Sequence, residues 1–152
     1  MVSPIFITKP NTDNYYSPLV FRSSDVPKAV IDETTIESTL EVAEIGTISD
    51  LDVQLNIEDH WWINDLVVTL IAQDGTEIRL ASYPDVVGGG YDGAMFDDEG
   101  RDLEARWWDF PFNKSYKPVE SLSRLDGQPI EGVWTLLDLI IGYPVYRADT
   151  VR

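Results

Sequence analysis

Alternation of polar and apolar positions is clearest between Asp50 and Glu58. These residues (DLDVQLNIE) alternate without a break, and a period of two places successive side chains on opposite faces of a strand. The segment therefore predicts a strand with one wet face and one dry face. Ile36, Leu40 and Val42 stand among polar residues a little earlier, and they predict a second half-buried strand.

Denser apolar runs predict three more strands. Residues 65–72 (DLVVTLIA) are rich in β-branched side chains, which favour a strand over a short helix. They are followed by Asp74-Gly75 and then by 77–81 (EIRLA), and Asp-Gly between two such runs is typical of a hairpin turn. Residues 132–139 (GVWTLLDL) predict the last strand, with Trp134 in the core.

The other segments have weaker patterns. Residues 1–30 contain four prolines and predict an extended N-terminal arm or a lead-in strand. Residues 84–116 are rich in glycine and acids, with little periodicity, and they predict a long irregular loop with a functional role. Several short strands separated by turns favour an all-β fold, and we expect residues 31–152 to form an antiparallel jelly-roll β-sandwich.

The charge balance limits the class of partner. The chain has 27 acidic and 11 basic residues, a formal net charge of -16. Such a surface repels phosphate backbones and anionic membranes and attracts cations or a basic partner. The sequence has no cysteine, which excludes disulfides and zinc ribbons. It also has no apolar run of transmembrane length and no recognisable signal peptide.

Catalytic chemistry has little support in the sequence. His60 is the only histidine, so one chain cannot build a site with two or three histidine ligands, and we expect a structural or surface role for it. No Gly-x-Ser-x-Gly motif marks a nucleophile. Asp97 and Asp98 are neighbours in one segment and lack the contrasting environments that glycoside hydrolysis requires. We therefore expect no enzymatic activity, with a hydrolase as the weakest alternative.

Seven short segments occur in the same order as in a known family. They are 36–42 (IESTLEV), 46–57 (GTISDLDVQLNI), 60–66 (HWWINDL), 67–76 (VVTLIAQDGT), 96–99 (FDDE), 111–122 (PFNKSYKPVESL) and 125–136 (LDGQPIEGVWTL). Together they resemble the P domain (P/Homo B domain) of kexin- and furin-like proprotein convertases, which also recurs in bacterial secreted proteins. The resemblance covers about residues 20–139.

The chain departs from the family pattern at three places. Asn64 stands where the family has Gly, and Asp126 stands where it usually has Asn. After Leu139 the usual closing strand is missing. Residues 145–151 are a candidate divergent version of it, and the N-terminal arm or a neighbouring chain are the alternatives. A missing strand would leave an open sheet edge, which is a docking site for a partner strand.

The resemblance implies a calcium site. Many bacterial P domains are similar in holding calcium with the Asp before Leu, here Asp65, and with the Asp-Asp-Glu segment. The residues agree with this, because Ca²⁺ prefers clustered carboxylate and carbonyl oxygens. The candidate metal ligands are therefore Asp65, Asp92, Asp97, Asp98 and Glu99. The alternative is a solvated acidic loop.

Two tryptophan pairs, 61–62 and 107–108, are candidate contact residues. In a strand one of two adjacent side chains points inward, so each pair is expected to have one core member. Trp62, Trp107 and Trp108 are expected near the acidic segment and are the candidates for contact with a partner or a sugar.

These observations predict a non-catalytic, calcium-binding structural or interaction subunit that docks on or stabilises a partner protein. The alternatives are a carbohydrate-binding or adhesin module and a P-domain fragment of a subtilisin-like protease. The family resemblance implies an extracellular or cell-surface location.

Overall fold

The computed structural model describes residues 2–10, 19–29, 31, 34–58, 60, 63–82, 90–103 and 111–140, with the backbone alone for 2–10, 139 and 140. The described residues form nine β-strands and two 3₁₀ helices of three and four residues. None of the helices in this part of the chain is long and apolar enough to cross a membrane. The predicted all-β class is confirmed.

The first sheet has the strand order β2-β1-β4-β7-β8. Its neighbouring strands are antiparallel except β7 and β8, which run parallel. The segment predicted as an N-terminal arm or lead-in strand thus contributes two paired strands to this sheet. The strands are β1 (Val2–Pro10), β2 (Leu19–Arg22), β4 (Ile48–Ile57), β7 (Tyr91–Arg101) and β8 (Ser115–Tyr116).

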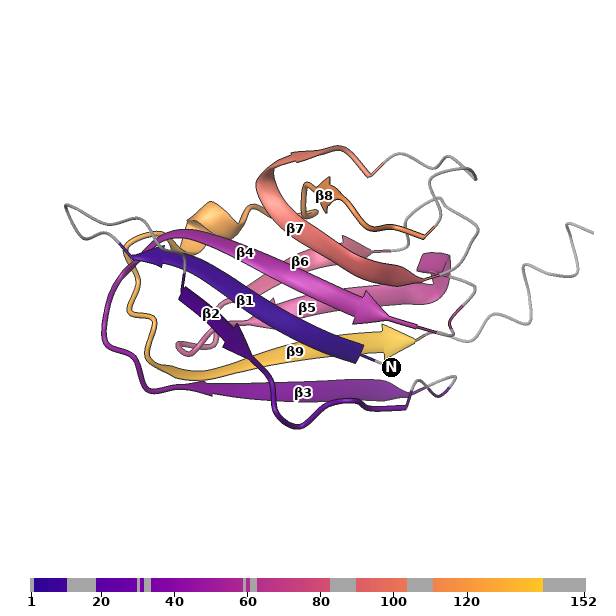
Figure 1. Cartoon of the computed structure of the whole chain (residues 1–152), viewed down its shortest axis with the longest axis horizontal. Coiled ribbons are helices and arrows are strands. Elements are labelled where there is room, and N and C mark those ends of the chain that lie inside the picture. The colour runs from indigo at the N-terminus through magenta and orange to yellow at the C-terminus, as the bar shows by residue number, and fades with distance from the viewer. Residues whose placement is uncertain are drawn as a thin grey trace, which may run out of the picture.

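The second sheet has the order β3-β9-β5-β6 and is antiparallel throughout. It lies behind the first sheet, face to face with it, in a sandwich-like arrangement (Figure 1). Helix η1 (Ile63–Asp65) precedes β5, and helix η2 (Leu122–Leu125) lies between β8 and β9. The strands are β3 (Thr35–Val42), β5 (Leu66–Ile71), β6 (Glu77–Ser82) and β9 (Gly132–Ile140).

The core lies between the two sheets, and the sequence periodicity explains its composition. In β4 the apolar residues Leu51, Val53, Leu55 and Ile57 are buried, while the polar residues between them are more exposed. The predicted alternation in β4 is therefore confirmed, and β3 follows the same rule, burying every second residue. Trp134 is buried as predicted, and its indole N–H donates to the carbonyl of Ile130 at 2.9 Å.

The predicted β5–β6 hairpin is also confirmed. Gly75 closes the turn with an N–H donated to the Ala72 carbonyl at 2.9 Å, and its φ is 86°. The carboxylate of Asp74 accepts the N–H of Thr76 at 2.8 Å. Positive φ is costly for residues with a Cβ, so glycine suits this position.

The long irregular loop predicted for 84–116 is wrong in its central part, where β7 occupies Tyr91–Arg101. Tyr91, Ala94 and Phe96 are buried, but the spacing from Tyr91 to Ala94 breaks a period of two. The pairing of β7 with β4 shifts register between Leu55 and Ile57. A register irregularity of this kind hides a strand from periodicity arguments. The proposed closing strand at 145–151 lies outside the described residues.

Candidate functional site

The acidic segment 97–99 lies at a sharp bend in β7. Phe96 and Arg101 both pair with Tyr116 of β8, so the residues between them curve around that strand. Gly100 makes the bend possible, because a Cβ at this position would lie 2.6 Å from the Tyr116 carbonyl carbon. The acidic segment, which the sequence predicted as part of a loop, is thus held by strand pairing before it, at Phe96, and after it, at Arg101.

Asp98 binds the start of helix η2. Its Oδ1 accepts the backbone N–H of Leu122 at 2.9 Å. Its Oδ2 accepts the N–H of Ser123 at 2.8 Å and the hydroxyl of Ser121 at 2.5 Å. The first N–H groups of a helix have no partner within the helix, and a carboxylate satisfies them well. Partial burial raises the pKa of Asp98, but these donors outweigh it and hold the pKa below its usual value.

Asp97 and Glu99 interact with each other. Asp97 Oδ1 accepts the N–H of Glu99 at 2.7 Å, and its Oδ2 accepts the hydroxyl of Ser115 at 3.0 Å. The pKa of Glu99 is raised, first by a side-chain hydrogen bond with Asp97, then by slight desolvation and by the negative charges of Asp50 and Asp97. The hydrogen bond with Asp97 favours the protonated form of Glu99, and the neighbouring negative charges also disfavour its ionisation.

Two further acids join this group, and sequence reasoning missed both. Asp126 follows η2, and its pKa is raised by partial burial and by the charges of Asp50 and Asp98. Asp50 lies in β4, and the sequence pattern identified it only as a polar position of the alternating segment. We call Asp50, Asp97, Asp98, Glu99 and Asp126 the acidic end. No local sequence pattern could have placed Asp50 and Asp126 near residues 97–99, because their proximity depends on how β4, β7 and η2 meet.

The other two predicted metal ligands lie elsewhere. Asp92 is exposed near the first residue of β7, beside the Ile57 end of β4. Asp65 ends η1, and η1 and η2 lie at opposite ends of the sandwich (Figure 1). The structure therefore brings together Asp97, Asp98 and Glu99 and separates them from Asp65.

The five predicted ligands do not fit a single calcium site in this arrangement. Within the described part of the chain, no three His, Cys, Asp or Glu side chains are grouped so that they could hold a metal ion. Asp98 already uses both oxygens on η2. The acidic end is a patch of mutually repelling charge, with a structural carboxylate at its centre.

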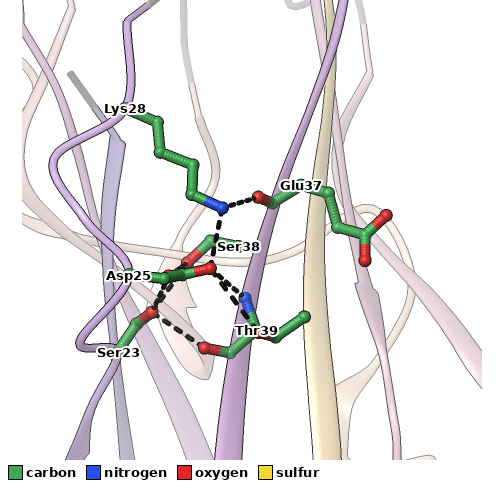
Figure 2. Close-up of polar contacts among 6 residues, drawn as sticks. All are labelled: Ser23, Asp25, Lys28, Glu37, Ser38 and Thr39. Carbon is green, nitrogen blue, oxygen red and sulfur yellow. Dashed lines mark hydrogen bonds and ion pairs between the residues drawn. The ribbon is translucent and has the colours of Figure 1, made fainter.

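A second polar network fastens the chain after β2 to the outer edge of β3 (Figure 2). Asp25 Oδ1 accepts the hydroxyls of Ser23 and Ser38. Its Oδ2 accepts the ammonium of Lys28 at 2.7 Å and the backbone N–H of Thr39 at 3.0 Å. Partial burial raises the pKa of Asp25, but these donors together hold it well below its usual value.

The same network satisfies backbone groups on the edge of β3. The Ser23 hydroxyl donates to the Thr39 carbonyl at 2.9 Å, and the Lys28 ammonium donates to the carbonyl of Glu37. β3 pairs with β9 on its other side. Exposed strand edges are templates for pairing with other chains, and side chains that occupy their polar groups block this.

The remaining candidate residues are His60 and three tryptophans. His60 is buried, in agreement with a structural rather than an exposed position. Trp62, Trp107 and Trp108 lie outside the described residues.

Comparison of the chain with protein-family models, with curated proteins and with solved structures finds no significant match.

Proposed function

We propose that this chain is a non-catalytic β-sandwich module of the jelly-roll type that acts as a structural or docking subunit and uses its acidic end to bind cations. The class of partner is a protein with a basic surface, and the metal is calcium. The resemblance to P domains, which pack against and stabilise a protease domain, supports the docking role.

The observation that carries this proposal is that β4, β7 and η2 meet at the acidic end, where Asp98 is bound to η2 and the pKa of Glu99 and of Asp126 is raised. Neighbouring carboxylates raise both values in part, so folding brings together charges that repel each other. A divalent cation or a cationic side chain turns that repulsion into attraction. Calcium binding would require the side chains of Asp97 and Glu99 to turn from their present hydrogen bonds toward the ion.

Thermal unfolding in EDTA and in excess calcium tests the metal. At calcium about a hundredfold above its Kd, binding stabilises the folded state by about 2.7 kcal/mol. For a domain of this size we expect the midpoint to rise by about 5–10 °C. Magnesium at the same concentration serves as the control for ionic strength. An unchanged midpoint in calcium would remove the metal from the proposal and leave the docking role standing.

Two variants localise the effect. Glu99→Gln should raise the midpoint in EDTA, because it removes repulsion with Asp97, and should weaken the response to calcium. Asp92→Asn is the matched control, since Asp92 is exposed on the same strand and away from the acidic end. Equal calcium responses of the two variants would contradict a site at the acidic end.

Size analysis and crosslinking of native material test the docking role. We expect the chain in an assembly that dissociates as salt is raised. Salt shortens the Debye length, and exposed charges separated by more than this length are largely screened. Native material that contains only the free monomer at low salt would contradict a docking subunit.

A further inference from the structure

An aspartate lies inside the sandwich. Trp134, Leu136 and Asp138 alternate on the inner face of β9 and are all buried, with Asp138 only 1% exposed. Asp138 is paired with Ile36 on β3 and with Val68 on β5, and both of these neighbours are buried apolar residues. The carboxyl group is therefore surrounded by hydrocarbon within its own sheet.

One phenol group faces this carboxyl from the other sheet, and a second phenol lies near the first. Tyr91 of β7 and Tyr116 of β8 are almost completely buried. Burial raises the pKa of Tyr91, and the negative charge of Asp138 raises it further. Among the described residues, neither oxygen of Asp138 has a hydrogen-bond partner, and neither tyrosine hydroxyl has one. Most buried polar groups in folded proteins are hydrogen-bonded, so three unsatisfied groups in one region require an explanation.

An ionised carboxylate in this position would be very costly. A buried charge without a partner is avoided by taking up or losing a proton. A neutral carboxyl removes the charge and also becomes a donor, for which phenol oxygens are suitable acceptors.

We propose that the interior of the sandwich contains a proton-binding site formed by Asp138 with Tyr91 opposite it, and that the protein folds with a proton on the Asp138 carboxyl. The pH of the surroundings then controls the stability of the module.

The electrostatics of the surrounding elements agree with this. Burial raises the pKa of Asp138 to about 7, and the positive charge of the amino terminus opposes the rise. β3 and β5 present the apolar residues Ile36 and Val68, and Tyr91 is the titratable group of the opposite sheet that interacts with Asp138 among the described residues. Its raised pKa keeps the Tyr91 phenol neutral near pH 7.

The sign of the pH dependence follows from linkage. The folded-state pKa lies above the ordinary value of 3.8, so the folded state binds the proton more tightly than the unfolded chain. The stability that this proton provides is fully present below the unfolded-state pKa and is lost as the pH rises through about 7.

Urea unfolding of the wild type and of Asp138→Asn in EDTA tests the proposal. Between about pH 5 and pH 8 we expect the folding equilibrium constant of the wild type to fall about 100-fold relative to that of the variant. Any constant effect of the amide cancels in this ratio. Asp92→Asn is the control and should follow the wild-type pH profile.

Parallel pH profiles for the wild type and Asp138→Asn would overturn the proposal. Should the variant fail to fold, carboxyl-carbon NMR titration of Asp138 in the unaltered protein decides. A midpoint above about pH 6 supports the buried proton, whereas a midpoint near the ordinary aspartate value of about 4 overturns it.

Discussion

Asp25 and Asp138 show how strongly environment separates two identical side chains. Asp25 is partly exposed and accepts hydrogen bonds from Ser23, Lys28 and Thr39 among others, which hold its pKa well below the usual range. Asp138 is buried without a hydrogen-bond partner among the described residues, and burial raises its pKa to about 7. The two carboxyls therefore affect stability in opposite directions as the pH changes.

Asp25 carries the first prediction at this scale. Because its folded-state pKa is depressed, its contribution is present above the unfolded-state value of 3.8 and is lost as the pH falls below it. We expect Asp25→Asn to lower the free energy of unfolding by about 2 kcal/mol at pH 7. Chemical denaturation at pH 7 and near pH 3 measures this, with the difference from wild type shrinking at the lower pH. A difference that grew on acidification would contradict the assignment.

At the scale of elements, the bend of β7 around β8 determines where the acids lie. It pairs Phe96 and Arg101 with the same residue, Tyr116, and leaves Asp97, Asp98 and Glu99 between these two pairs. From this position Asp98 caps η2. The bend thus creates both the acidic end and the anchor for the helix that precedes β9.

Gly100→Ala tests the bend. An added Cβ would lie 2.6 Å and 2.7 Å from backbone atoms of Tyr116 and 2.9 Å from the Asp97 carbonyl oxygen, so the backbone would have to move. We expect a loss of about 2–3 kcal/mol in the free energy of unfolding, as for other overpacked sites. Gly46→Ala is the matched control, because its Cβ would meet only the Ile130 side chain at an ordinary 3.8 Å. Equal losses for the two variants would mean that the close approach at Gly100 is unimportant.

For the whole molecule, the net charge of -16 adds a general repulsion to the local one at the acidic end. Compact states with a large net charge are destabilised by self-repulsion, and salt screens it. The acidic end concentrates five carboxylates in one region, so salt is expected to screen repulsion there.

Monovalent salt in the presence of EDTA provides the test at this scale. We expect the unfolding midpoint of the wild type to rise by a few degrees between low and physiological salt. The combined variant Asp50→Asn, Glu99→Gln, Asp126→Asn should respond less, because part of the repulsion has been removed. Identical responses, measured by calorimetry, would place the repulsion elsewhere on the surface.

The described fold was largely predictable where one face of a strand is buried and the other is not. β3 and β4 follow the alternation of the sequence, and β5 and β6 follow from apolar runs joined at Asp74-Gly75. β7 was not predictable, because its pairing is irregular and its buried residues do not follow a period of two. Of the predicted metal ligands, only Asp97, Asp98 and Glu99 are neighbours in space, as they are in the sequence.

The sequence by itself determined the all-β class, the faces of the regular strands and the excess of negative charge, because these depend on residue type and on local period. Only the tertiary structure decided that Asp50 and Asp126 join the acidic end, that Asp98 caps η2, and that Asp138 faces Tyr91 across the core. These contacts join residues far apart in the chain, and the order and bending of strands sets them. A local pattern specifies which side of a strand is buried, but not what lies opposite it.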